Sequence, residues 1–174
     1  METVERTMSW AYADSGDARL DRQHESLIHL TEALNEVIGG RGGRELGTLL
    51  CDFLGKRLER HFRTEEASVQ DKADMAGFNI LHDSHQQILK LFAAVRSSIA
   101  TDATAERARH FNAFRLAMAC HDRQIDGPLF QRLGTGGHLH TPMVGESASR
   151  IPLYINAPRD ERHRLTDGIP IHDG

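Results

Sequence analysis

The sequence predicts an all-α protein, an antiparallel up-down-up-down four-helix bundle with an N-terminal arm and an irregular C-terminal tail. Apolar residues recur at helical spacing in four long stretches between about residues 17 and 126. Short breaks rich in glycine, aspartate and threonine separate these stretches, and the alternating apolar pattern of strands is absent from this region. Because long helices joined by short loops pack as antiparallel neighbours, a bundle is the expected architecture.

Length and composition are those of one globular domain. The 174 residues can bury a core, and 39% hydrophobic with 26% charged residues is typical of a soluble protein. A formal charge of -4 argues against a nucleic-acid partner and against a polybasic membrane contact. No run approaches the roughly 20 apolar residues of a membrane span, and the N-terminus lacks the apolar core of a secretion signal. We therefore expect a cytoplasmic protein, with Cys51 and Cys120 as free thiols.

Three segments of the chain differ in character. Residues 1–16 lack helical periodicity and are predicted to form an arm, and Ser15 or Asp17 can cap the helix that follows. Residues 17–133 are predicted to form the bundle. Residues 134–174 hold four of the five prolines and follow no sustained period, which predicts an irregular tail.

The first helix is expected from about Asp17 to Ile38, where a glycine-rich loop at residues 39–43 stops it. The second is expected from about Glu45 to Ala67. Its predicted core residues are all large and apolar: Leu49, Leu50, Phe53, Leu54 and Leu58.

The third helix is expected from about Phe78 to Ala100, after punctuation at residues 74–77. The fourth is expected from about Ala105 to Asp126, with a cap in residues 101–104, and Gly127-Pro128 should end or break it.

Histidines and carboxylates are placed to meet inside this bundle. His61 and Glu65 are four residues apart, so they project from the same face of a helix. That pattern alone also arises by chance on solvated helices. Its significance comes from the other three helices, each of which brings a histidine, and the fourth also an aspartate: His24, His85, His121 and Asp126. Four imidazoles and two carboxylates exceed the needs of one tetrahedral zinc and suit a pair of irons bridged by Glu65 and Asp126.

These residues resemble the metal-binding signature of the hemerythrins, in particular the bacteriohemerythrins. The resemblance rests on residues 21–27 around His24, on residues 61–66, on His85, and on His121 followed five positions later by Asp126. Trp10, fourteen residues before His24, is similar to a tryptophan on that family's N-terminal arm. The resemblance covers about residues 8–130.

The resemblance implies two non-heme iron ions, joined by an oxo or hydroxo group and by Glu65 and Asp126. His24 and His61 would hold one iron, and histidines of the third and fourth helices the other. In the family, dioxygen binds end-on to the iron with fewer histidines, is held at the peroxide level and leaves again as dioxygen. Bacterial members serve in oxygen binding, delivery, storage or sensing.

The sequence departs from the family pattern in the third helix. The family has His-x-x-x-His there, but Leu81 stands four residues before His85, and His82 three residues before it. On a helical wheel Leu81 lies about 40° to one side of His85 and His82 about 60° to the other. His82 can therefore be a metal ligand if the helix rotates or contains a π-bulge; otherwise the second iron keeps an open position.

Several neighbours of these ligands are candidates for the pocket or for contacts behind the ligands. They are Leu81, His110, Met118 and Cys120. Glu66, about 100° from Glu65, is expected to be a solvated charge.

The leading functional hypothesis is an oxygen-binding di-iron protein rather than an enzyme. The first alternative is a di-iron oxidase or peroxidase-like enzyme on the same scaffold, because an open coordination position favours reactivity. The second is a sensory module whose tail reports the state of the iron to a redox or signalling protein partner.

Overall fold

Four long helices make up most of the part of the chain that the structure describes. The computed structural model describes residues 12–72, 74–101 and 103–140. The helices are α1 (Ala18–Ile38), α2 (Arg44–Gln70), α3 (Met75–Ile99) and α4 (Thr104–His121). The prediction of an all-helical protein is confirmed. Trp10 and residues 141–174, which include most of the predicted tail, lie outside the described residues.

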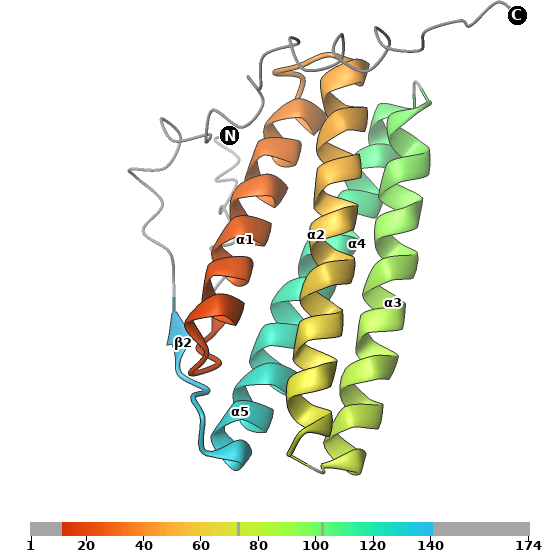
Figure 1. Cartoon of the computed structure of the whole chain (residues 1–174). Coiled ribbons are helices and arrows are strands. Elements are labelled where there is room, and N and C mark those ends of the chain that lie inside the picture. Colours follow the sequence, from red (N-terminus) through yellow and green to blue (C-terminus); the bar gives the residue numbers. More distant parts are fainter. Residues whose placement is uncertain (1–11, 73, 102, 141–174) are drawn as a thin grey trace, which may run out of the picture. The chain divides into compact units, whose positions relative to one another are not determined.

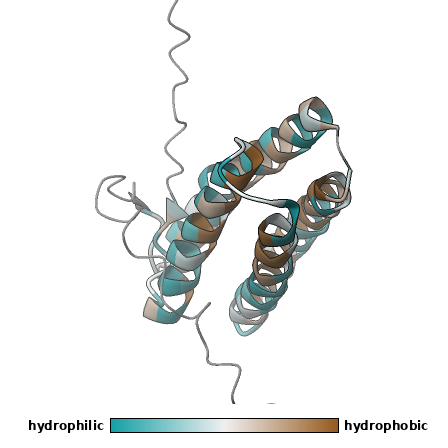
Figure 2. Cartoon of the chain, turned by 90° about the horizontal axis from the view of Figure 1, so that it is seen from above, coloured by the Kyte–Doolittle hydropathy of each residue, from teal (hydrophilic) through white to brown (hydrophobic). Residues whose placement is uncertain are grey.

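Successive helices pack side by side: α1 against α2, α2 against α3, and α3 against α4 (Figure 1). Short loops join them, and α1 also contacts α4. Seen along the helices, apolar residues gather on the sides that face neighbouring helices and polar residues on the outside (Figure 2). No helix among the described residues is long and apolar enough to cross a membrane.

Side-chain caps fix where two of the helices begin. The carboxylate of Asp17 accepts a hydrogen bond from the backbone N–H of Arg19 at 2.7 Å, as the sequence predicted. The carboxylate of Asp74 accepts from the N–H of Gly77 at 2.9 Å, so α3 begins at Met75 rather than near Phe78. In the loop after α1, Gly40 adopts a positive φ of 95°, which glycine tolerates without steric cost.

One row of apolar side chains on α2 lies in the core. A second row, which was also predicted to be buried, is exposed. Leu50, Leu54 and Leu58 are buried and pack with apolar residues of all four helices. Leu49 and Phe53, also predicted to be buried, are 40% and 42% exposed. Each precedes a buried residue by one position, which turns it about 100° away from the core.

The fourth helix does not stop at Gly127-Pro128. A π-helix of five residues, Asp122–Asp126, follows α4, and the short helix α5 (Gly127–Leu133) continues from it. The N–H of Gly127 donates to the carbonyl of Asp122, five residues earlier. Pro128 has no N–H to donate, so a helix that runs into it must change its hydrogen-bond pattern, and the π-helix is that change.

Two short strands join the end of the arm to the start of the predicted tail. Strand β1 (Tyr12–Ala13) pairs antiparallel with β2 (Leu139–His140), Tyr12 opposite His140 and Ala13 opposite Leu139. Neither strand was predicted from the sequence, since two residues are too few to show a period.

We predict that Leu54→Ala lowers the free energy of unfolding by about 2–5 kcal/mol, because it leaves a cavity where a side chain is fully buried. Leu49→Ala, five residues earlier on the exposed side, should cost less than about 1 kcal/mol. Urea denaturation of both variants measures the difference. Equal losses would contradict the assignment of these two rows.

Candidate metal centre

Four imidazoles meet around one carboxylate in the interior of the bundle. His24 of α1, His61 of α2, His85 of α3 and His121 of α4 are each at most 2% exposed. Between them lies Glu65, also of α2 and fully buried. The Nε2 atoms lie 3.2–3.9 Å from its oxygens: 3.4 Å for His24, 3.4 Å for His61, 3.2 Å for His85 and 3.9 Å for His121. The structure thus brings together the five residues that the helical periods aligned.

The π-helix adds two aspartates to this cluster. Asp126 Oδ1 lies 3.1 Å from His121 Nε2, and Asp122 Oδ1 lies 3.9 Å from His24 Nε2. In an α-helix, residues five apart differ by about 140° in direction, whereas the i→i+5 bonding of a π-helix returns Asp126 to the side of His121. Asp126 was predicted from the sequence and Asp122 was not. The signal that could have revealed it is Pro128, which forces the change of register.

Neighbouring side chains accept hydrogen bonds from the Nδ1 atoms of three of the imidazoles. His85 Nδ1 is 2.8 Å from Glu66 Oε1, His61 Nδ1 is 3.3 Å from Gln23 Oε1, and His121 Nδ1 is 2.9 Å from Ser84 Oγ. With Nδ1–H donating, each Nε2 carries the lone pair that a metal ion needs. None of these three hydrogen-bond acceptors was predicted from the sequence. Glu66 was expected to be solvated, but it faces α3.

Electrostatics keep the central carboxylate charged. Burial opposes the ionisation of Glu65, but the surrounding imidazoles outweigh burial and hold the pKa of Glu65 well below its usual range. A buried anion of this kind requires cations around it.

The imidazoles supply this compensation unequally. Burial lowers the pKa of His61 to about 3. Burial also opposes protonation of His24, but Glu65 and two aspartates outweigh it and raise the pKa of His24 to about 9. The pKa of His121 is likewise raised well above its usual range by Asp126 and Glu65, against the effect of burial. Metal ions that bind here would replace protons on His24 and His121.

The unpaired polar atoms of the cluster fit a metal centre. Buried atoms without a hydrogen-bond partner are the Nε2 atoms of His24, His85 and His121, both oxygens of Glu65 and both oxygens of Asp126. Such atoms are costly unless a ligand satisfies them. Ligand atoms within 4.8 Å of one another occur in three groups: His24 with His61 and Glu65, Glu65 with His85 and His121, and His24 with Asp122 and Asp126. Imidazole and carboxylate donors suit iron, manganese or zinc.

The structure does not bring His82 into this cluster. Its Nδ1 lies 3.1 Å from Glu66 Oε1, its side chain is 43% exposed, and its ring stacks on Phe78. Leu81 is fully buried and packs with Val69 and Leu129. The π-helix that the sequence suggested for α3 occurs instead after α4.

Three further candidates lie at different depths. Met118 is fully buried in the main apolar core. His110 lies 3.9 Å from Glu106 near the other end of α4, and Cys120 is a partly buried free thiol. None of the three belongs to the groups of candidate ligands among the described residues.

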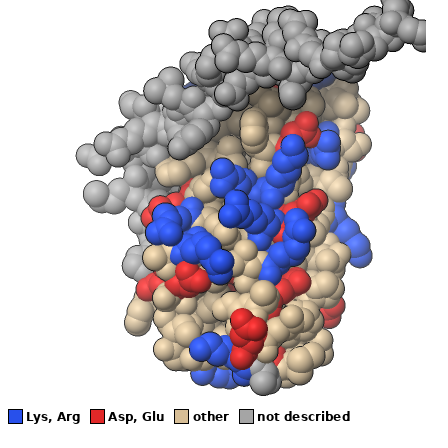
Figure 3. Space-filling view, viewed as in Figure 1, with Lys and Arg blue, Asp and Glu red and all other residues tan. Residues whose placement is uncertain are grey.

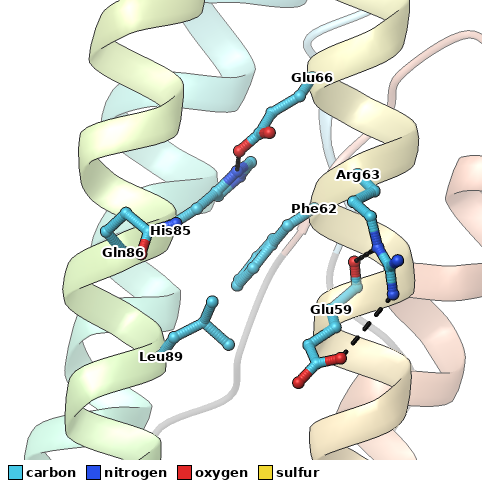
Figure 4. Close-up of a pocket in the computed structure, with 7 residues that line it drawn as sticks. All are labelled: Glu59, Phe62, Arg63, Glu66, His85, Gln86 and Leu89. Atoms are coloured by element: carbon cyan, nitrogen blue, oxygen red, sulfur yellow. Dashed lines mark hydrogen bonds and ion pairs between the residues drawn. The ribbon is translucent and has the colours of Figure 1, made fainter.

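A surface pocket of about 290 Å³ lies beside the cluster, between α2 and α3 (Figure 4). Phe62 and His85 line it, and their rings stack with centroids 3.9 Å apart. Phe62 is only 3% exposed and also contacts the ring of His121 edge-on. Phe62 is therefore an apolar wall between the pocket and the cluster.

A helical bundle that gathers buried histidines and carboxylates from four helices defines a class of cation-binding proteins. A sequence model of the hemerythrin HHE cation-binding domain matches residues 15–133. The chain therefore belongs to the hemerythrin family. Comparisons with curated proteins and with solved structures found no significant match.

We predict that Glu66→Gln weakens metal binding by about 10–100-fold. The uncharged amide would orient the His85 ring less firmly than the carboxylate does, and it would raise the basicity of that ring less. The matched control is Glu59→Gln, which removes an exposed glutamate at the same pocket and should leave the affinity unchanged. Competition with a chromogenic chelator measures both. Equal affinities in the two variants would show that Glu66 does not support the centre.

Proposed function

We propose that this chain is a non-heme di-iron protein that binds dioxygen and serves as an oxygen carrier, store or sensor. One observation carries the proposal: four buried imidazoles, one from each helix, meet at a single buried carboxylate whose oxygens have no hydrogen-bond partner. Membership of the hemerythrin family supports it. The proposal also adopts the antiparallel up-down-up-down order of the helices and a cytoplasmic location.

Two metal positions would share the central carboxylate. His24 and His61 would hold one iron and His85 and His121 the other, with Glu65 and Asp126 common to both. Iron at these positions would supply the electrons and the open coordination that dioxygen binding needs.

The protein would position the imidazole rings that hold the metal ions and keep water away from the cluster. Gln23, Ser84 and Glu66 fix the ring orientation of three imidazoles. Phe62 closes the side toward the pocket, and Tyr12 covers His24 with its ring centroid 5.2 Å away. A buried centre with these walls admits a small neutral molecule more easily than an ion or a bulky reductant.

A redox or signalling partner is part of this proposal. Lysine and arginine side chains gather on the face of α1 and α2 that Figure 3 shows. Arg19, Arg60 and Arg63 line a polar surface pocket of about 480 Å³ there. Asp17 and Asp71 line the same pocket, so this face offers a partner both positive and negative groups rather than one sign of charge.

A second candidate function is an enzyme that activates dioxygen or peroxide. Leu81, where the family signature has a histidine, is fully buried among apolar residues, and His82 lies outside the cluster. The ion at His85 and His121 would then have fewer protein ligands, and an open position favours turnover over clean reversible binding.

We expect two irons per chain, and absorption bands that appear when the reduced protein receives a pulse of oxygen and disappear when oxygen is removed. Metal analysis and optical spectra of the same sample measure this. His61→Ala, which removes a predicted ligand, is the control that should lose the bands. Irreversible oxidation, or fewer than two irons per chain, would contradict the proposal of an oxygen carrier and favour the proposal of an enzyme.

Leu81→His should slow autoxidation of the reduced protein, because an imidazole one turn from His85 can fill the open position. Ile80→His adds the same side chain one residue earlier, where Ile80 is 58% exposed, and should change nothing. The rate of loss of the oxygenated spectrum compares the variants. If Leu81→His oxidises as fast as the unsubstituted protein, the account of the open position is wrong.

A further inference from the structure

Asp122 lies on the side of the cluster that holds His24. It follows His121 directly and begins the π-helix, and its Oδ1 atom is 3.9 Å from His24 Nε2. The residue is 1% exposed. A carboxylate at this depth needs a cation nearby, whether a proton on an imidazole or a metal ion.

The surroundings of Asp122 point independently to a ligand. Ligand atoms of His24, Asp122 and Asp126 all lie within 4.8 Å of one another. In this group His24 Nε2 and both oxygens of Asp126 are buried and lack a hydrogen-bond partner. Three donors of the kinds that bind iron thus converge beside the position of His24 and His61.

The ligand count then differs between the two metal positions. In the proposed arrangement each position would have two imidazoles. Glu65 groups with both pairs of histidines, and Asp126 groups with His24 and lies 3.1 Å from His121 Nε2. Leu81 supplies no donor to the position of His85 and His121. We propose that Asp122 is a third terminal ligand of the ion held by His24 and His61, so that the open coordination position belongs to the ion held by His85 and His121. This inference rests on the proposed function, because it requires two ions.

The consequence concerns where a small ligand enters. The family resemblance places dioxygen on the iron of His24 and His61, whereas Asp122 closes that position here. The open position instead lies on the side of His85, whose ring stacks on Phe62 beside the pocket between α2 and α3. A small anion or dioxygen would reach the ion past Phe62.

Cobalt(II) titration of the full chain, followed by its absorption bands, tests the role of Asp122. The unsubstituted protein should bind two ions, and Asp122→Asn, which keeps the shape and removes the charge, should weaken one of them at least about tenfold. Asp83→Asn, an exposed aspartate on α3, is the control and should bind like the unsubstituted protein.

The outcomes separate the two hypotheses. If the unsubstituted protein binds no cobalt, the proposed function fails and this inference with it. If it binds two ions and Asp122→Asn binds them equally well, only the inference is overturned. A purely structural role for Asp122 would lower the thermal midpoint of the metal-free variant with no loss of cobalt affinity, and would also overturn it.

Azide added to the cobalt protein tests the open position. It should shift the cobalt bands, and Leu81→His should weaken azide binding about tenfold because the new imidazole competes for the same position. Unchanged azide affinity in Leu81→His would place the open position elsewhere and overturn the second half of the inference.

Discussion

The fold is organised around the cost of burying charge. Seven ionisable side chains, four histidines and three carboxylates, are at most 2% exposed within a bundle whose other interior residues are mainly apolar. An isolated carboxylate at such a depth would be neutralised or would unfold the protein. Here Glu65 of α2 lies within 4 Å of an imidazole from each of the other three helices, so moving any of these helices breaks a pair. The polar cluster therefore fixes the helices relative to one another more strictly than apolar packing alone does.

The register change at the end of α4 gives this cluster its third carboxylate. In a regular α-helix Asp122 and Asp126 would share one face, about 100° and 140° around the helix from His121. The π-helix presents all three, and it exists because Pro128 interrupts the hydrogen-bond ladder. A π-helix usually makes a helix less stable, but in this chain it places two candidate ligands, Asp122 and Asp126, in the cluster.

Much of the fold and the centre of the site could be predicted from the sequence, because helical spacing is a local property. His24, His61, Glu65, His85 and His121 follow from the periods of the four helices, and Asp126 was placed with them at the end of the fourth. Asp122 was not predicted, because its direction depends on a π-helix whose sign in the sequence is Pro128 rather than a period of apolar residues. The role of Glu66 depends on how α3 packs against α2, and the sequence of neither helix alone shows this packing. Leu49 and Phe53 were assigned to the core for the same reason. Their apolar character does not show how much of the surface of α2 the neighbouring helices cover.

The short pairing of β1 with β2 ties the segment that contacts His24 to the segment that follows α5. The ring of Tyr12 lies on His24, and β1, which contains Tyr12, is hydrogen-bonded to β2. The polypeptide continues from β2 into residues 141–174. A change in the orientation of the His24 ring would therefore reach Tyr12 first and, through Tyr12, the two residue pairs that the described part of this ladder contains.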